Sequence, residues 1–263
     1  MRLGRAAVTR RETSVKTYPL VPFCPAVIEK SRVFAREAGY TAAVMCGRFY
    51  LTATPAEIRK VFKLESLPKL VPRYNIAPMQ SAPIVVAEEA GRAVLMARWG
   101  LVPAWSRDLS PGAGMINAPA ETLEEKPAYR TALQSQRCLV PANGFYEWQA
   151  RGTKKQPYKI TLRHGALIAF AGLWARWAPE EGDAVETFTI VTTRASKLVS
   201  EVHDRMPVII SPTDYQRWLT APAATAKKLL LPYAAGLTIT AVSDRVNSLK
   251  NDDVSLLQPA ATG

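Results

Sequence analysis

The chain has 263 residues and a mass of 28.9 kDa, which suits one large domain or two small ones. Hydrophobic residues make up 48% and charged residues 21%, which excludes wholesale disorder, and no apolar run approaches the ~20 residues that a membrane span needs. A net charge of +12 predicts an anionic partner, with nucleic acid as the first candidate and an indifferent basic surface as the alternative.

Residues 1–44 differ in composition from the rest of the chain. They hold eight basic and three acidic residues, so +5 of the net charge lies there and +7 lies beyond. The segment has no apolar core of a secretory signal and no sustained helical or strand period. We expect an extension that is disordered or absent from the mature protein, followed by one domain over residues 45–260. Met45 is a second possible start codon.

From Cys46 onward, strands and a few helices are expected in irregular succession. A strand at 46–52 precedes a helix that runs to about Phe62, opened by a capping box of Thr54 and Glu57 with Pro55 at the first helical position. Residues 82–87 and 93–99 form a predicted hairpin. Further strands are predicted at 137–140, 144–149, 158–162, 166–174, 186–193 and 237–242, and helices at 127–136, at 196–203, and from Ser211-Pro212 with Asp214 as capping acid. This order favours an α+β fold with a largely antiparallel sheet.

The cysteine and histidine content argues against metal and disulfide chemistry. Cys24, Cys46 and Cys138 form no CxxC pair, which is typical of a reduced, cytoplasmic protein. With only His164 and His203, a histidine-built metal site is not expected. No cofactor is expected either.

Six short segments are richer in polar and special residues than a core requires: 45–49, 73–78, 99–105, 116–121, 144–148 and 202–207. Their joint order and spacing, with the tail at 246–251 and 257–259, resembles the SRAP family (SOS-response-associated peptidase, abasic-site-processing proteins). The resemblance runs from Met45 to about Pro259. It implies a barrel-like, largely antiparallel β core with flanking helices. It also implies a partner, single-stranded DNA with abasic sites, and a covalent protein–DNA crosslink that shields the lesion during repair.

Cys46 is the candidate nucleophile. If translation starts at Met45 and the initiator is removed, Cys46 becomes an N-terminal 1,2-aminothiol, with an amine of pKa about 7.7–8.0 beside a thiol of about 8.5. The amine can attack the aldehyde of an abasic site to give a Schiff base, and the neighbouring thiol can then close a thiazolidine ring. A buried structural thiol is the alternative. Cys138 is expected in a core strand.

Other candidate residues follow from the resemblance. Glu147 is implied to protonate the ring-opened sugar oxygen, and its place among aromatic residues predicts a raised pKa. His203 is implied to assist imine formation and crosslink reversal. Asn117 is implied to hydrogen-bond the sugar and the cysteine terminus. The family commonly has an arginine two positions later, where this chain has Pro119, so that phosphate contact is not carried over and a basic residue elsewhere could compensate.

The predicted DNA-binding residues are Gly47, where the backbone can approach a ligand, and four larger side chains. Arg48 and Arg205 could contact phosphates through their guanidinium groups. Trp99 and Trp105 could stack on bases, although tryptophans at this spacing are as often core residues. Asn75 is expected to shape the wall of the site.

Three functions are compatible with the sequence. The first is covalent, lyase-like capture of abasic sites through Cys46. The second is a Cys–His hydrolase or autopeptidase using Cys46 and His203, and the third is a non-covalent nucleic-acid-binding module. A monomer without membrane contact, located with cytoplasmic DNA, is expected in each case.

Overall fold

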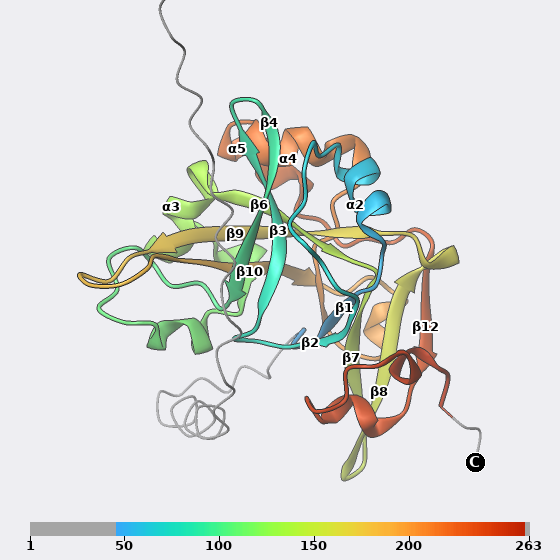
Figure 1. The fold of residues 1–263 in the computed structure, drawn as a ribbon. Coiled ribbons are helices and arrows are strands. Elements are labelled where there is room, and N and C mark those ends of the chain that lie inside the picture. Colours follow the sequence, from blue (N-terminus) through green and yellow to red (C-terminus); the bar gives the residue numbers. More distant parts are fainter. Residues whose placement is uncertain (1–45, 261–263) are drawn as a thin grey trace, which may run out of the picture.

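The computed structural model describes residues 46–260, which contain a five-stranded and a seven-stranded sheet (Figure 1). The predicted extension at 1–44 and the predicted start at Met45 lie outside this range. Among the described residues, no helix is both long and apolar enough to cross a bilayer.

The seven-stranded sheet closes on itself and forms the centre of the molecule. Its hydrogen-bonded order is β11-β10-β4-β3-β6-β9, and β9 also pairs with β10, so that β10, β4, β3, β6 and β9 form a closed barrel. These strands are β3 (Ser81–Glu88), β4 (Gly91–Trp99), β6 (Arg137–Ala142), β9 (Ile168–Trp177), β10 (Val185–Arg194) and β11 (Arg205–Pro207), with short β5 (Asn117–Pro119) beside β10. Most pairings are antiparallel, whereas β4 and β5 run parallel to β10. The predicted α+β fold with a barrel-like sheet is confirmed.

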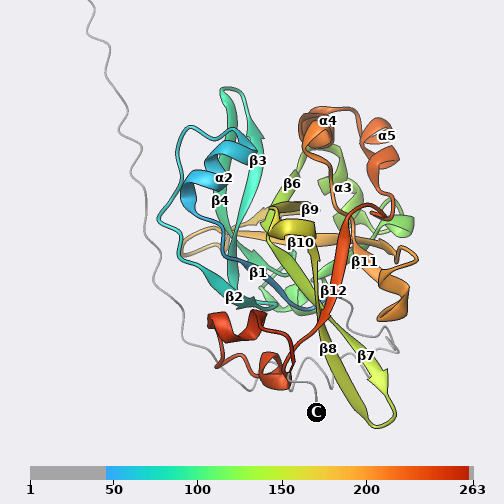
Figure 2. The same ribbon diagram turned by 90° about the vertical axis from the view of Figure 1, so that its right-hand side faces the viewer.

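The five-stranded sheet lies against one side of the barrel. It contains β1, the first strand after Cys46. Its order is β12-β8-β7-β1-β2, with β1 (Phe49–Leu51), β2 (Arg73–Ile76), β7 (Gly144–Arg151), β8 (Lys154–Leu162) and β12 (Leu237–Ala241). Both views show the β7–β8 hairpin reaching away from the barrel and the red C-terminal segment folding back beside β2 (Figures 1 and 2). Residues near the two ends of the described chain therefore meet at this sheet.

Within residues 46–260, four α-helices surround the sheets: α2 (Pro55–Phe62), α3 (Pro127–Ser135), α4 (Tyr215–Thr220) and α5 (Ala223–Ala226). The capping box predicted for α2 is present, with Thr54 accepting from the Glu57 backbone N–H and Glu57 accepting from that of Thr54. Phe62 of this helix stacks on Tyr215 of α4, with ring centroids 5.2 Å apart. The two helices thus anchor distant chain segments on the barrel.

Three predicted elements differ from the structure. The strand predicted from Cys46 begins only at Phe49, because Cys46 has a left-handed backbone (φ 40°) that an extended strand cannot include. The helix predicted at 196–203 is a single 3₁₀ turn, Val199–Glu201. Arg194 and Arg205 are paired across β10 and β11, so residues 195–204 form the connection between these two strands. Ser211 makes no side-chain cap, and α4 starts only after Asp214.

Strand β7 separates two hydrophobic cores. Phe145 belongs to the large core of the barrel, whereas Tyr146 belongs to a smaller cluster with Tyr50, Val242, Val246 and Leu256. Side chains alternate along a strand, so Glu147 faces the same side as Phe145. The sequence of β7 therefore buries a carboxyl group between the two sheets.

Candidate active site

Cys46 and Glu147 meet where the chain enters β1. Strand β1 pairs with β7, placing Phe49 opposite Phe145, and the Tyr146 N–H donates to the Arg48 carbonyl at 3.0 Å. This register brings the residues before β1 alongside Glu147. The Cys46 backbone N–H donates to Glu147 Oε1 at 2.8 Å, and both residues are buried, with 3% and 2% of their surfaces exposed. A carboxyl group is thus held on the nitrogen of Cys46.

The burial of this pair changes the protonation of both side chains. Desolvation raises the pKa of the Glu147 carboxyl, and the charge of His203 and the hydrogen bonds from Cys46 offset part of this rise. Burial also raises the pKa of the Cys46 thiol well above its ordinary value, and the charge of Glu147 and a hydrogen bond to it add to the effect. The carboxyl group therefore contacts both the nitrogen and the sulfur of one residue, and the sulfur stays protonated near neutrality.

His203 lies beside this pair on the connection between β10 and β11. Its Nδ1 accepts from the Arg205 backbone N–H at 3.1 Å and lies 3.0 Å from Asp204 Oδ1. Gln149 of β7 donates through Nε2 to the Glu201 carbonyl at 2.6 Å, which ties the His203 turn to the strand of Glu147. Only 15% of the His203 side chain is exposed, so the turn holds an imidazole close to the buried carboxyl.

Asn117 is the first residue of β5. This strand runs parallel to β10, with Asn117 opposite Ile190 and Pro119 opposite Thr192. The Tyr129 hydroxyl of α3 donates to the Asn117 carbonyl at 3.1 Å and fixes the start of the strand. Asn117 therefore lies beside β10, the strand that leads into the connection carrying His203.

Arg48 and Asn75 form a support behind Cys46. Arg48 donates through Nη1 to Asn75 Oδ1 and to the Val246 carbonyl, each at 2.9 Å, and its guanidinium lies 5.8 Å from the Trp148 ring centroid. Burial lowers the pKa of Arg48 to about 10. Asn75 Nδ2 donates to the carbonyls of Val246, Ser248 and Asn251 at 3.3, 3.1 and 2.8 Å. The observed contacts of Arg48 are all within the protein, and its predicted phosphate contact stays a prediction.

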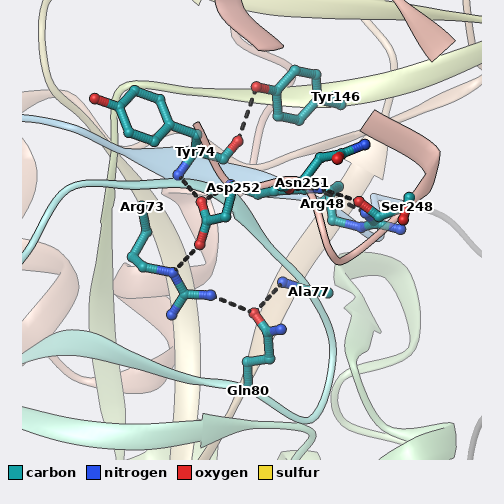
Figure 3. Close-up of polar contacts among 10 residues, drawn as sticks. Arg48, Arg73, Tyr74, Ala77, Gln80, Tyr146, Ser248, Asn251 and Asp252 are labelled. Carbon is teal, nitrogen blue, oxygen red and sulfur yellow. Dashed lines mark hydrogen bonds and ion pairs between the residues drawn. The ribbon is translucent and has the colours of Figure 1, made fainter. Parts of the chain in front are cut away.

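Asp252 extends this support to β2, as Figure 3 shows. Its carboxylate accepts from the backbone N–H groups of Tyr74 and Asn75, and it pairs with Arg73. Arg73 also donates to Gln80 Oε1 at 2.8 Å. The C-terminal segment is thereby fixed to the sheet that presents Cys46. The sequence placed Asn75 in the wall of the site, but gave no signal that its partners lie more than 170 positions later.

A family model for the SOS response associated peptidase (SRAP) matches residues 45–249, which contain Cys46, Asn117, Glu147 and His203. The chain belongs to the SRAP family. The predicted resemblance is therefore confirmed.

Named relatives and solved structures agree with SRAP membership. The chain is 41% identical over 222 residues to the abasic site processing protein YoaM of Bacillus subtilis, covering 81% of this chain and 97% of that protein. It is 34% identical over 227 residues to the abasic site processing protein HMCES of Gallus gallus, covering 73% and 67%. A crystal structure of a protein from Bacteroides thetaiotaomicron superposes with a TM-score of 0.73 at 25% identity, covering 82% of this chain and all of that one.

The two tryptophans predicted to contact DNA in this SRAP chain lie in different environments. Trp99 is fully buried, with its ring centroid 5.2 Å from that of Phe49 and its indole N–H donating to the Ile116 carbonyl at 2.8 Å. The prediction that Trp99 stacks on bases is wrong for this conformation, because the last residue of β4 faces the barrel core. Trp105 is 72% exposed and is free to stack.

Arg205 and Gly47 flank the site. Arg205 makes a two-pronged ion pair with Glu121, at 2.8 and 2.9 Å, and donates to the Thr192 carbonyl at 3.0 Å. A phosphate contact by Arg205 would have to share or replace Glu121. Gly47 is half-buried between Cys46 and Arg48, where its predicted role in a close ligand approach stays a prediction. Cys138 lies in the barrel core, as expected.

No group of three or more His, Cys, Asp or Glu side chains within residues 46–260 is arranged to hold a metal ion. The site that the structure assembles is instead a nitrogen, a thiol, a carboxyl group and an imidazole, contributed by Cys46, Glu147 and His203.

Proposed function

We propose that this protein captures abasic sites in single-stranded DNA by a covalent bond to Cys46. The observation that carries the proposal is the 2.8 Å hydrogen bond between the Cys46 nitrogen and the buried Glu147 carboxyl group. Membership of the SRAP family and the names of relatives such as YoaM and HMCES support abasic DNA as the substrate.

The protonation states favour attack by nitrogen before sulfur. An α-amine with a pKa of about 7.7–8.0 is appreciably neutral near pH 7.5, whereas the thiol of Cys46 is held protonated by burial and by Glu147. The amine adds to the aldehyde carbon C1′ of the ring-opened sugar to form a carbinolamine. The carboxylate of Glu147 takes the proton that the nitrogen loses, because it already accepts a hydrogen bond from that atom, and passes this proton to the former carbonyl oxygen.

Loss of water and ring closure complete the crosslink. Glu147 then transfers the second proton of the nitrogen to the carbinolamine hydroxyl, which leaves as water and gives the neutral imine. The thiol then adds to the imine carbon, forming the C–S bond, while its proton is transferred to the imine nitrogen. The reaction consumes one aldehyde and one aminothiol and produces one thiazolidine and one water, without an oxidant or a reductant. His203, whose charge acts on Glu147, is proposed to assist these proton transfers.

This chemistry requires Cys46 to carry a free amine. We therefore propose that the active form begins at Cys46, through a start at Met45 with removal of the initiator or through cleavage of the leader. The match to the family model from residue 45 supports this proposal, as does the coverage of 97% of YoaM by 81% of this chain. Intact-mass measurement of the native protein tests it.

A Cys–His peptidase is less well supported by the site. Cysteine nucleophiles of hydrolases are activated by a lowered thiol pKa. Here burial and the adjacent Glu147 carboxyl raise the pKa of the Cys46 thiol. The same group arrangement suits amine chemistry, in which the thiol acts second.

The deciding experiment is incubation with single-stranded DNA that carries one abasic site. The active form should give a band shift that survives heat and denaturant, and Cys46→Ala should abolish it. Cys138→Ala is the matched control, because it removes the other described thiol from the barrel core and leaves Cys46 in place. Acetylation of the Cys46 amine should also abolish the shift. Undiminished trapping by Cys46→Ala or by the acetylated protein would refute the proposal.

A further inference from the structure

A groove lies at the end of β10, where the Ala195 backbone N–H donates to the carbonyl of Asp204, the residue after His203. It has a volume of about 530 Å³ and is lined by Ala120 and Glu121 of the turn after β5, by Thr193 and Arg194 of β10, and by Ala195, Lys227, Leu230, Leu231 and Pro232. This volume lies within the roughly 300–1,000 Å³ of small-ligand sites. Leu231, which is 65% exposed, contributes part of its apolar wall. The groove is thus large enough for part of a nucleotide.

The groove adjoins the site through three chain segments. Asn117 begins β5, and the chain passes directly from Pro119 into the turn of Glu121. With a rise of about 3.3 Å per residue, Pro119 lies roughly 7 Å along β5 from Asn117. Arg205 is two residues after His203 and pairs with Arg194 across the sheet. A DNA strand whose lesion lies at Cys46 and Asn117 would therefore bring a flanking phosphate near the groove.

The charges around the groove leave one cation without a dedicated partner. Arg205 is paired with Glu121, and Lys227 is paired with Glu124. Arg194 is exposed, and its side chain makes no hydrogen bond or ion pair with any described residue. Its charge does reach Glu121, whose pKa is lowered chiefly by the hydrogen bond from Arg205 and to a smaller extent by Arg194. Arg194 is therefore the guanidinium that is available to a ligand.

The register places Arg194 on the same side of the sheet as Pro119. Thr192 pairs with Pro119, and Arg194 pairs with Arg205. Residues two apart on a strand share a face, so Thr192, Arg194 and their partners point to one side. The guanidinium of Arg194 in β10 thus lies on the same side of the sheet as Pro119 in the neighbouring strand β5.

Resting on the proposed function, we infer that Arg194 binds a backbone phosphate of the DNA strand next to the abasic site, with the apolar wall at Leu231 receiving the adjoining sugar. The contact supplies affinity and register and takes no part in the covalent steps. A guanidinium fork can bind two phosphate oxygens, which a lone ammonium cannot reproduce in the same geometry.

The test measures equilibrium binding of abasic single-stranded DNA to the full chain in a Cys46→Ala background, where no crosslink forms. Arg194→Gln should weaken binding roughly five- to tenfold and reduce the slope of log affinity against log salt by about 0.7, the value for one phosphate on a single strand. Arg194→Lys should restore the slope and only part of the affinity. Arg163→Gln is the matched control, because Arg163 is an exposed arginine that does not line the groove.

A scan of single neutral methylphosphonate linkages locates the contact. One linkage near the lesion should weaken binding of the parent protein but produce no additional loss in Arg194→Gln. Equal effects of Arg194→Gln and Arg163→Gln at every linkage would overturn the inference. The proposed function is judged separately by the heat-stable product with Cys46 present. If no heat-stable product forms, but the methylphosphonate linkage still has no additional effect in Arg194→Gln, covalent capture alone is refuted. If the product forms, but the linkage weakens binding of Arg194→Gln as much as that of the parent, only the Arg194 contact is refuted.

Discussion

Replacement of Glu147 by glutamine is the most informative perturbation of the site. Glutamine keeps an oxygen that can accept the hydrogen bond now made at 2.8 Å by the Cys46 nitrogen, but it cannot take or return a proton. General acid–base groups contribute typically ~10²–10⁴-fold to rate. Each factor of ten corresponds to about 1.4 kcal/mol of activation free energy. We expect Glu147→Gln to slow crosslinking by at least tenfold and by about a hundredfold if proton transfer limits the rate.

The same substitution should act on the thiol in the opposite direction. The charge of Glu147 and its hydrogen bond help raise the pKa of the Cys46 thiol, so their removal should lower that pKa. Alkylation of Cys46 should therefore reach half of its maximal rate at a lower pH in Glu147→Gln, although crosslinking is slower. A general distortion of the site has no reason to produce this pair of opposite effects.

The assay follows covalent product against time under single-turnover conditions over a range of pH. The parent rate should rise as pH increases through the raised pKa of Glu147, because the carboxylate form accepts the proton, and this dependence should be absent from Glu147→Gln. Glu186→Gln is the matched control, since Glu186 pairs with Arg176 near the other end of β10. A crosslinking rate in Glu147→Gln equal to that of Glu186→Gln would remove Glu147 from the mechanism.

Three further predictions concern stability and the neighbouring residues. Because burial raises the folded-state pKa of Glu147, its ionisation opposes folding. The free energy of unfolding should therefore fall as pH rises from the unfolded-state pKa near 4.5 through the raised folded-state pKa. Urea titrations should show this loss in the parent and not in Glu147→Gln. His203→Ala should slow crosslink formation or release without lowering the melting temperature, whereas His164→Asn should have parent kinetics in both directions; identical kinetics for the two variants would contradict the role of His203. Asn75→Ala should cost about 2–5 kcal/mol of unfolding free energy, since it removes four side-chain hydrogen bonds at a buried position, and a loss no larger than that of exposed Asn247→Ala would show that the support is dispensable.

Much of the fold was accessible from local patterns. The capping box of Thr54 and Glu57, the β3–β4 hairpin and the long strands β7 to β10 follow from residues that are close in sequence. Strand β5 was missed because three residues carry no detectable period, and its pairing with β10 joins segments about 70 positions apart. The predicted helix at 196–203 is only a 3₁₀ turn at Val199–Glu201, because local propensity does not report that these residues connect the paired strands β10 and β11.

The site shows the same limit at the level of side chains. The alternation along β7 predicts that Glu147 shares a face with Phe145, and both side chains are buried in the structure. Only the register of β1 against β7 reveals that the carboxyl group contacts the Cys46 nitrogen rather than simply lining a pocket for the sugar. The sequence could not predict which of Trp99 and Trp105 is exposed, because this depends on the tertiary fold. Trp99 is buried in the barrel core, whereas Trp105 lies exposed in a loop.

The contacts of Asn251 and Asp252 bear on how this protein can be shortened. The family model stops at residue 249, yet Asn251 accepts from Asn75 and Asp252 accepts from the amides of Tyr74 and Asn75. A chain cut at 249 would keep every reactive group but would remove the carboxylate that accepts from the Tyr74 and Asn75 amides and one of the three carbonyls that accept from the Asn75 carboxamide. The end of the family match at residue 249 is therefore not the end of the folded domain. A shortened protein should extend at least to Leu256, whose side chain is buried in the smaller core.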